Sequence, residues 1–188
     1  SYTDALMLSG ETASGKYPLE AVKTMAAIAE QAEKDRNAMG EWEVPMNANC
    51  SQREFLAHAA IDATRQLGVA GIITDSLTGE TVRHLAAFRG PNPVLAICYK
   101  EKTQRWLNLS YGVIPIHQKE QASAEYMFIA ALRMLRQKGY ITLDDKIAYL
   151  SGSFGLGNPT GTTFLEINKV SQVFDKSYEF HLPQKEQQ

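Results

Sequence analysis

The stretch "VAGIITDSLTGETVRHLAAF", residues 69–88, decides the fold class of this chain. Its opening residues, 69–74, form an apolar run with the length and composition of a buried strand. Residues 80–88 follow after a short polar loop and have the pattern of a helix. A buried strand followed by a helix is the unit of a parallel sheet, because parallel strands need a long and usually helical crossover.

The same alternation continues along the rest of the chain. Further strands are expected at residues 93–98, 112–116 and 146–150, with helices at 102–108 and at 123–138, the latter ended by Gly139. Residues 151–163 are glycine-rich and lack a helical pattern, so the last strand, within residues 162–170, should run antiparallel beside the strand at 146–150. The sequence therefore predicts a three-layer α/β/α fold with a mostly parallel five-stranded sheet and an antiparallel last strand.

Two further helices are expected upstream. Ser51 and Glu54 form a capping box. The buried stripe of that helix is expected to contain Phe55, Leu56, Ala59, Ala63 and Leu67. An earlier helix begins at Pro18, continues to about Glu33, and follows residues 4–8, which are expected to end a strand. The apolar face of that earlier helix is expected to contain Leu19, Val22, Ala26 and Ala29.

The composition is that of an ordinary soluble globular protein. The chain has 188 residues, of which 44% are hydrophobic and 21% charged, with a formal net charge of −2. This charge gives no reason to expect a nucleic-acid partner, and no apolar run reaches the length of a membrane span. Cys50 and Cys98 fit free thiols in a reducing compartment, and no basic and apolar leader is present, so we expect a cytoplasmic protein. The four histidines have no metal-ligand spacing, and no metal site is expected.

Residues 10–16, "GETASGK", match the G-x-x-x-x-G-K frame of a nucleotide-binding P-loop. A working P-loop needs Ser or Thr after the lysine to hold Mg²⁺, and this chain has Tyr17 there. Pro18 also biases Tyr17 away from the helical conformation, so the helix begins too late to surround a phosphate at Lys16. These two residues exclude the P-loop interpretation.

The same region closely resembles a different signature. Residues 4–28, "DALMLSGETASGKYPLEAVKTMAAI", are similar to the last strand, loop and helix of the catalytic barrel of the pyruvate kinase family. "EKTQRWLNLSYGVIPI" (101–116) and the closing "LSG…GTT" resemble the C-terminal domain of that family. The resemblance covers residues 1 to about 170. It implies the end of a (β/α)8 barrel at 1–36 and a regulatory α/β domain at 37–170. The polar tail at 171–188 lies outside the resemblance and is expected to be loosely held, although Val173, Phe174, Tyr178 and Phe180 could dock.

The resemblance implies the transfer of a phosphoryl group from phosphoenolpyruvate to ADP, giving pyruvate and ATP in the final step of glycolysis. The family uses Mg²⁺ (or Mn²⁺) and usually K⁺. Only Ser9 and Glu11 match positions that line its active site, in a supporting role, and the metal-holding carboxylates come from earlier barrel strands. We therefore expect this fragment to be inactive alone, to bind neither metal, and to self-associate, because family members are commonly tetramers. The alternative is a stand-alone module that binds a phosphate effector or a partner without catalysis.

The family resemblance also implies an effector site. Its C-terminal domain often binds a regulatory sugar phosphate, and the matching loop here is residues 75–81 at a helix N-terminus. The expected ligand groups, including two from the glycine-rich loop nearby, are Ser76, Thr78, Gly79, Thr81, Ser153 and Gly155. Glu80 departs from the family pattern, and its carboxylate would repel a phosphate. The alternative is a capped helix start without a ligand. Trp106 and Tyr111, which flank the third strand, are expected to be packing or interface groups.

Overall fold

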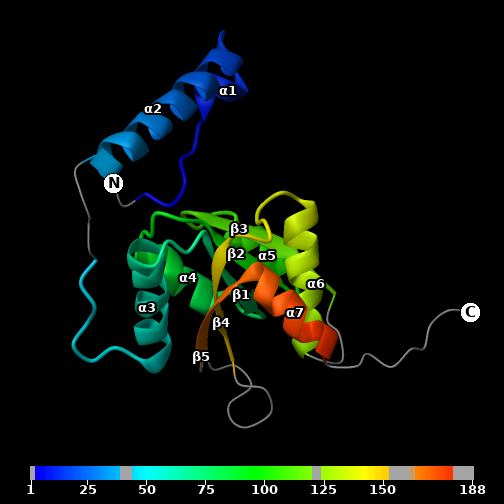
Figure 1. The fold of residues 1–188 in the computed structure, drawn as a ribbon. Coiled ribbons are helices and arrows are strands. Elements are labelled where there is room, and N and C mark those ends of the chain that lie inside the picture. The colour runs from blue at the N-terminus through cyan, green and yellow to red at the C-terminus, as the bar shows by residue number, and fades with distance from the viewer. Residues whose placement is uncertain (1–2, 39–43, 120–123, 153–161, 163, 180–188) are drawn as a thin grey trace, which may run out of the picture.

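The computed structural model describes residues 3–38, 44–119, 124–152, 162 and 164–179 (Figure 1). The elements, in chain order, are α1 (Gly10–Ala13), α2 (Pro18–Ala38), α3 (Gln52–Gln66), β1 (Gly71–Ser76), α4 (Glu80–Ala87), β2 (Val94–Cys98), α5 (Glu101–Leu107), β3 (Val113–His117), α6 (Ala124–Gln137), β4 (Lys146–Ser151), β5 (Phe164–Lys169) and α7 (Val170–Glu179).

The five strands form one sheet in the order β3-β2-β1-β4-β5. The β1–β2, β2–β3 and β1–β4 pairs are parallel, and β5 is antiparallel to β4, with Ser151 opposite Phe164. The predicted mostly parallel sheet and its antiparallel last strand are confirmed. An antiparallel pair does not need the long helical crossover that a parallel return would require.

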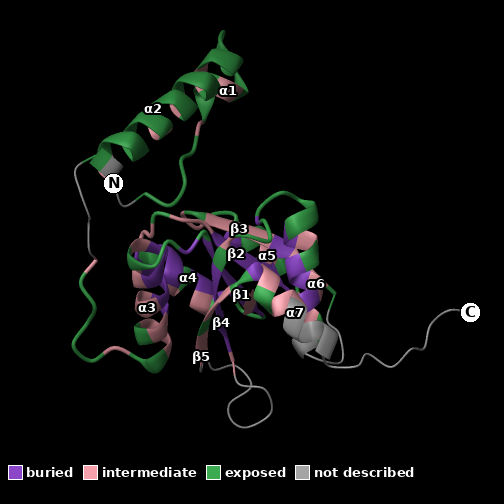
Figure 2. Ribbon diagram, viewed as in Figure 1, coloured by how far each residue is buried: buried purple, intermediate pink, exposed green. Residues whose placement is uncertain are grey.

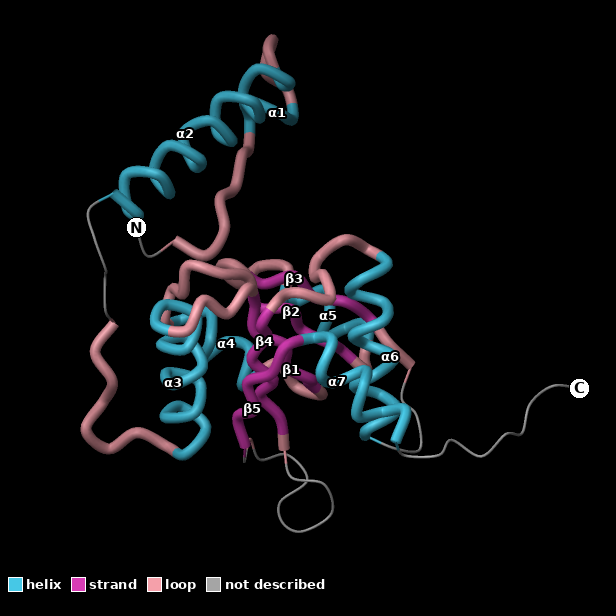
Figure 3. Tube along the Cα trace, viewed as in Figure 1, coloured by secondary structure: helices cyan, strands magenta, loops and turns pink. Residues whose placement is uncertain are grey.

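Helices cover both faces of the sheet. Helices α3 and α4 lie on one side of the strands, and α6 and α7 lie on the other (Figure 3). Side chains alternate along β1, so Ile72 belongs to the core under α3, α4 and α5, whereas Ile73 belongs to the core under α6 and α7. Cys98 is fully buried in the first core, and burial raises the pKa of its thiol to about 11. The three-layer α/β/α prediction is confirmed.

Helix α3 begins as predicted but is rotated relative to the predicted stripe. The Ser51 Oγ accepts a hydrogen bond from the Glu54 N–H at 3.2 Å, which confirms half of the capping box. The stripe was wrong at both ends, because Phe55 and Leu67 are 53% and 50% exposed. The buried residues are Ala57, Ala60, Ile61, Ala63 and Thr64. The small alanine side chains let the helix approach the sheet closely, so the largest apolar residues do not mark the buried face.

The N-terminal hairpin, residues 3–38, differs from the prediction in one respect. Residues 4–8 form no strand, because they pair with none of the five strands in a ladder. Gly10–Ala13 form a helical turn, and a Cβ at Gly15 would lie 2.4 Å from the Glu11 carbonyl oxygen. The glycine therefore permits the turn after α1 to pass close to the α1 backbone. None of the described residues of α2 is buried (Figure 2).

The chain continues into a helix where a polar tail was expected. Helix α7 starts directly after β5, and the backbone N–H of Val170 donates to the Asp145 carbonyl at 2.9 Å. Val173 and Phe174 pack against the core under α6, and the Arg136 guanidinium lies 6.0 Å from the Phe174 ring centroid. Residues 171–179, expected to be a loosely held tail, are helical, and the docking of Val173 and Phe174 is confirmed. Residues 180–188 lie outside the described part of the chain.

In the part of the chain that the structure describes, no helix combines the length and the apolar character that a membrane span requires.

Gly79 and Gly139 both place the backbone in the left-handed region beside a helix end. Gly139 (φ 76°) follows α6 as predicted, and the Tyr140 N–H donates to the Leu135 carbonyl at 3.0 Å. Gly79 (φ 82°) precedes α4, and a Cβ built there would lie 3.1 Å from Cδ2 of the buried Leu107. A Cβ at Gly139 would meet nothing within 4 Å. The two positions therefore share a backbone requirement and differ in crowding.

We predict that Gly79→Ala destabilises the protein more than Gly139→Ala does. Both variants force an alanine into the left-handed region, at a cost of about 1 kcal/mol. Gly79→Ala must also displace Leu107, which adds about 1 kcal/mol or more. Urea unfolding of the two variants and the parent chain measures the difference. Equal losses of unfolding free energy would show that the contact with Leu107 relaxes freely.

Candidate functional site at the carboxyl ends of β1 and β4

The predicted effector loop lies at the position where the strand order reverses. The chain leaves β1 through α4 toward β2, whereas β4 lies on the other side of β1 and leads to β5. In doubly wound sheets, ligands bind outside the carboxyl ends of the strands at such a switch point. The loop after β1 and the connection after β4 therefore meet at the edge where this architecture places binding sites.

Ser76 shapes this loop. It is the last residue of β1 and is buried, and its Oγ accepts a hydrogen bond from the Gly79 N–H at 2.7 Å. The left-handed conformation of Gly79 turns the chain into α4. The hydroxyl of Ser76 thus satisfies an amide that the turn would otherwise leave unpaired.

Thr81 connects the loop to the connection after β4. Its Oγ1 lies 2.7 Å from Oγ1 of Thr162, which is buried. This contact places the end of the glycine-rich connection against the first turn of α4, as the sequence analysis expected. Ser153 and Gly155 lie outside the described residues. Thr162 was not predicted as a site residue, since no local pattern relates positions separated by 81 residues.

Thr78 is exposed at the tip of the loop. Its carbonyl oxygen accepts a hydrogen bond from Arg83 Nη1 at 3.3 Å, and the neighbouring Leu77 carbonyl accepts one from Thr103 Oγ1 at 2.8 Å. Two side chains therefore hold the loop backbone while leaving the Thr78 side chain at the surface. The structure brings Ser76, Thr78, Gly79 and Thr81 together, as predicted.

The charge around the loop differs from the expectation. Glu80 forms an ion pair with Arg53 of α3, and the Arg53 side chain is the less exposed of the two. The Glu80 carboxylate is therefore matched by a positive charge, and Arg83 supplies a second guanidinium beside the loop. Neither arginine was predicted from the sequence as a site residue. Arg83 lies within the first turns of α4, so helical periodicity offered a signal, whereas Arg53 offered none.

Asp75 lies at the same edge, and the alternation of β1 directs it to the opposite face from Ser76. The Ser151 hydroxyl donates a hydrogen bond to the Asp75 carboxylate, which ties the ends of β1 and β4 together. Burial raises the pKa of the Asp75 carboxyl, and the hydrogen bond from Ser151 opposes that shift. Burial, and then the charge of Asp75, raise the pKa of Tyr149, whose ring stacks on Phe128 at 3.9 Å between centroids.

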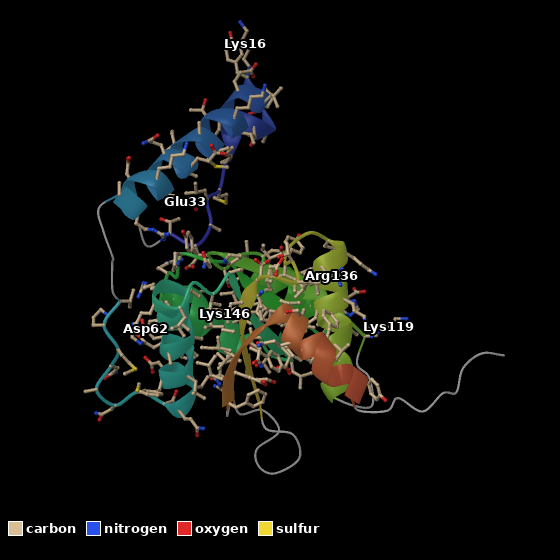
Figure 4. All side chains as sticks on the ribbon, in the orientation of Figure 1. Lys16, Glu33, Asp62, Lys119, Arg136 and Lys146 are labelled. Atoms are coloured by element: carbon tan, nitrogen blue, oxygen red, sulfur yellow. The ribbon has the colours of Figure 1, made fainter. Side chains whose placement is uncertain are left out.

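The predicted catalytic residues lie elsewhere. Ser9 precedes α1, and its carbonyl oxygen accepts hydrogen bonds from the Thr12 and Ala13 amides at 3.1 and 2.9 Å. Glu11 is exposed in the first turn of α1. Figure 1 shows α1 at the end of the N-terminal hairpin that points away from the sheet, and Lys16 extends from that end (Figure 4). The structure therefore separates Ser9 and Glu11 from the loop at Ser76–Thr81.

The described residues provide no metal centre. Among them, no group of three or more His, Cys, Asp or Glu side chains is arranged to hold a metal ion. Glu11 alone does not form a Mg²⁺ site, because such sites combine carboxylates with further oxygen ligands in octahedral geometry. The residues present at α1 therefore do not fit a bound metal ion.

We predict that Asp75→Asn changes the pH dependence of stability. Because the pKa of Asp75 is raised above its value in the unfolded chain, the folded state holds this proton more tightly. The associated stability is present at acidic pH and is lost as the pH rises through the folded-state pKa. The variant, which cannot ionise, should therefore gain stability relative to the parent between acidic and neutral pH.

Urea unfolding at a series of pH values measures this difference. Asp144→Asn is the matched control, because Asp144 is exposed and pairs with Lys169 at the surface. If the difference in unfolding free energy between Asp75→Asn and the parent is constant with pH, or changes in the opposite direction, then the pKa of Asp75 is not raised in the folded state.

Comparison with known proteins identifies the family. The family model for the pyruvate kinase alpha/beta domain matches residues 54–167, which include every strand of the sheet except the last two residues of β5. The chain is 38% identical over 173 residues to a pyruvate kinase of Borreliella burgdorferi, covering 91% of this chain and 36% of that protein. It is 35% identical over 164 residues to a pyruvate kinase of Clostridium acetobutylicum, covering 86% of this chain and 34% of that protein.

A third relative, a pyruvate kinase of Bacillus licheniformis, is 33% identical over 180 residues, covering 93% of this chain and 30% of the relative. The chain thus spans about a third of the length of the curated relatives that it matches. Because the family model matches more than half of the chain, the chain belongs to the pyruvate kinase alpha/beta domain family.

Proposed function

We propose that this chain is the C-terminal portion of a cytoplasmic, oligomeric pyruvate kinase, in which it supplies the last strand and helix of the catalytic barrel and a regulatory and assembly domain. The parent enzyme transfers a phosphoryl group from phosphoenolpyruvate to ADP. The observation that carries the proposal is the family match together with an N-terminal hairpin that has no buried face of its own.

The exposed apolar residues of the hairpin support this assignment. They are Leu6, Met7, Leu19, Val22 and Ile28. Met7 is 89% exposed, and Figure 2 shows α2 exposed along its length. A soluble protein rarely leaves such a surface uncovered, and in a (β/α)8 barrel the neighbouring strands and helices would cover it.

Ser9 and Glu11 would face the substrate in the complete barrel. They follow the extended segment 3–8, and active sites of (β/α)8 barrels lie at the carboxyl ends of the strands. Phosphoryl transfer depends on positioned groups and on cations that neutralise the transferred phosphate. Mg²⁺ (or Mn²⁺) and K⁺ would supply that charge from elsewhere in the barrel. Ser9 and Glu11 would support the hydrogen-bond network around the substrate.

We predict that the 188-residue chain alone does not convert phosphoenolpyruvate and ADP, because the residues that hold cations and substrate are not in it. A coupled assay for pyruvate formation with Mg²⁺ and K⁺ tests this. A Glu11→Gln variant purified in the same way controls for contaminating kinase. Activity that rises in proportion to chain concentration and is lost in Glu11→Gln would refute the prediction.

For the regulatory role, we infer that the loop Ser76–Thr81 binds the phosphate of a sugar-phosphate effector. Backbone N–H groups at the start of α4 and the helix dipole favour an anion there. Gly79 presents no side chain, Thr78 and Thr81 offer hydroxyls, and Arg83 adds a guanidinium. The pairing of Glu80 with Arg53 reduces the repulsion that the sequence suggested.

Isothermal titration calorimetry with fructose bisphosphate and other sugar phosphates tests the effector site. Arg83→Ala should weaken binding about tenfold or more, because a hydrogen bond to a charged group is lost. Arg105→Ala is the matched control, since Arg105 is exposed on α5 and pairs with Glu101. If no sugar phosphate gives a heat of binding, the loop is a helix cap and the domain is structural.

A further inference from the structure

Four residues from separate parts of the chain meet where the N-terminal hairpin approaches the α/β domain. The Asp4 Oδ1 accepts a hydrogen bond from Arg89 Nη1 at 2.8 Å and another from the Tyr111 backbone N–H at 3.2 Å. The Arg89 guanidinium lies 4.7 Å from the Tyr111 ring centroid, and the Arg36 guanidinium of α2 lies 5.1 Å from the same ring. Asp4, Arg36, Arg89 and Tyr111 are called the Asp4 latch below.

The backbone of Arg89 lies in the left-handed region. Arg89 is the described residue other than glycine that has a positive φ, 53°, and it directly follows the cap of α4. Its N–H donates to the Ala86 carbonyl at 3.1 Å. Glycine is the usual residue at this position after a helix, because the left-handed conformation crowds a Cβ. Strained residues of this kind mark places where the side chain has a role.

The latch joins the hairpin to the domain through polar side-chain contacts. Helices α1 and α2 pack on each other, and neither packs broadly on a described helix or strand of the α/β domain. The Arg89 side chain is only 9% exposed, so the ion pair with Asp4 is shielded from water on one side. A charge-assisted hydrogen bond in such surroundings is stronger than one at an open surface.

We propose that the Asp4 latch fixes the N-terminal hairpin on the α/β domain, with Arg89 as the positioning residue. The latch thereby sets the position of the Ser9–Ser14 turn relative to the sheet. Helix α4 lies between Gly79 and Arg89, so one end borders the effector loop and the other end borders the latch. The docking itself is independent of enzymatic activity, and only its consequence for the parent enzyme rests on the proposed function.

Hydrogen exchange of the Tyr111 amide tests the latch, because this amide donates to Asp4. In the 188-residue chain, Asp4→Ala should speed its exchange about tenfold, through loss of a hydrogen bond to a charged group. The Ile73 and Leu95 amides of the central sheet should be unchanged, which distinguishes release of the hairpin from unfolding. Small-angle scattering should show a larger radius of gyration. Asp35→Ala is the matched control, since Asp35 lies on α2 and accepts a local hydrogen bond from Gln31 at 2.7 Å.

Arg89→Gly provides the complementary variant. Glycine keeps the left-handed backbone and hence the end of α4, but it removes the guanidinium. The variant should match Asp4→Ala, and the double variant should exchange no faster than either single one. If each single variant changes Tyr111 exchange by less than about twofold, or if their effects add, the latch does not hold the hairpin. A failed latch leaves the calorimetric test of the effector site unaffected, and the converse also holds.

Discussion

The parallel pairing of β1 with β4 determines where the candidate ligand site lies in this domain. Because both strands end at the same edge, the loop after β1 and the connection after β4 have to meet. The alternation of β1 then sends Ser76 to the α4 face and Asp75 to the α6 face. On one face, Thr81 contacts Thr162, and on the other, Ser151 contacts Asp75. A side-chain hydrogen bond on each face of the sheet therefore connects the segment after β1 to the segment after β4.

These internal hydrogen bonds reduce the number of free groups that a ligand could use. The Ser76 hydroxyl already satisfies the Gly79 amide, and Thr81 already has a partner in Thr162. A phosphate would thus compete with internal hydrogen bonds that are worth about 1 kcal/mol each. The attraction of the phosphate to the Arg83 guanidinium and to the dipole of α4 must therefore exceed the free energy of the hydrogen bonds that it displaces. The ion pair between Arg53 and Glu80 contributes roughly 1 kcal/mol or less to stability, so its larger effect is to cancel the charge of Glu80.

The fold was predictable because its signals are local, whereas several site contacts were not. Short apolar runs and intervening helices report burial directly, so the sheet and its antiparallel edge followed from the residues. The stripe of α3 was misplaced because the prediction gave weight to the large Phe55 and Leu67, and the interface uses alanines. Residues 4–8 have the pattern of a strand, but a strand also needs a neighbour. Arg53, Thr162 and Arg89 act on residues far along the chain, and no periodicity reports such pairs.

The residues at the two ends of α4 have the same left-handed backbone conformation but different side chains. Both Gly79 and Arg89 have left-handed backbones, yet glycine occupies the first position and arginine the second. At Gly79 a side chain would strike Leu107, so steric crowding selects glycine. At Arg89 glycine would be the less strained choice, and arginine persists where its guanidinium reaches Asp4. Because α4 is a single helix about 12 Å long, a rigid-body shift of the helix would displace both ends. The helix therefore links the candidate effector loop to the hairpin that presents Ser9 and Glu11.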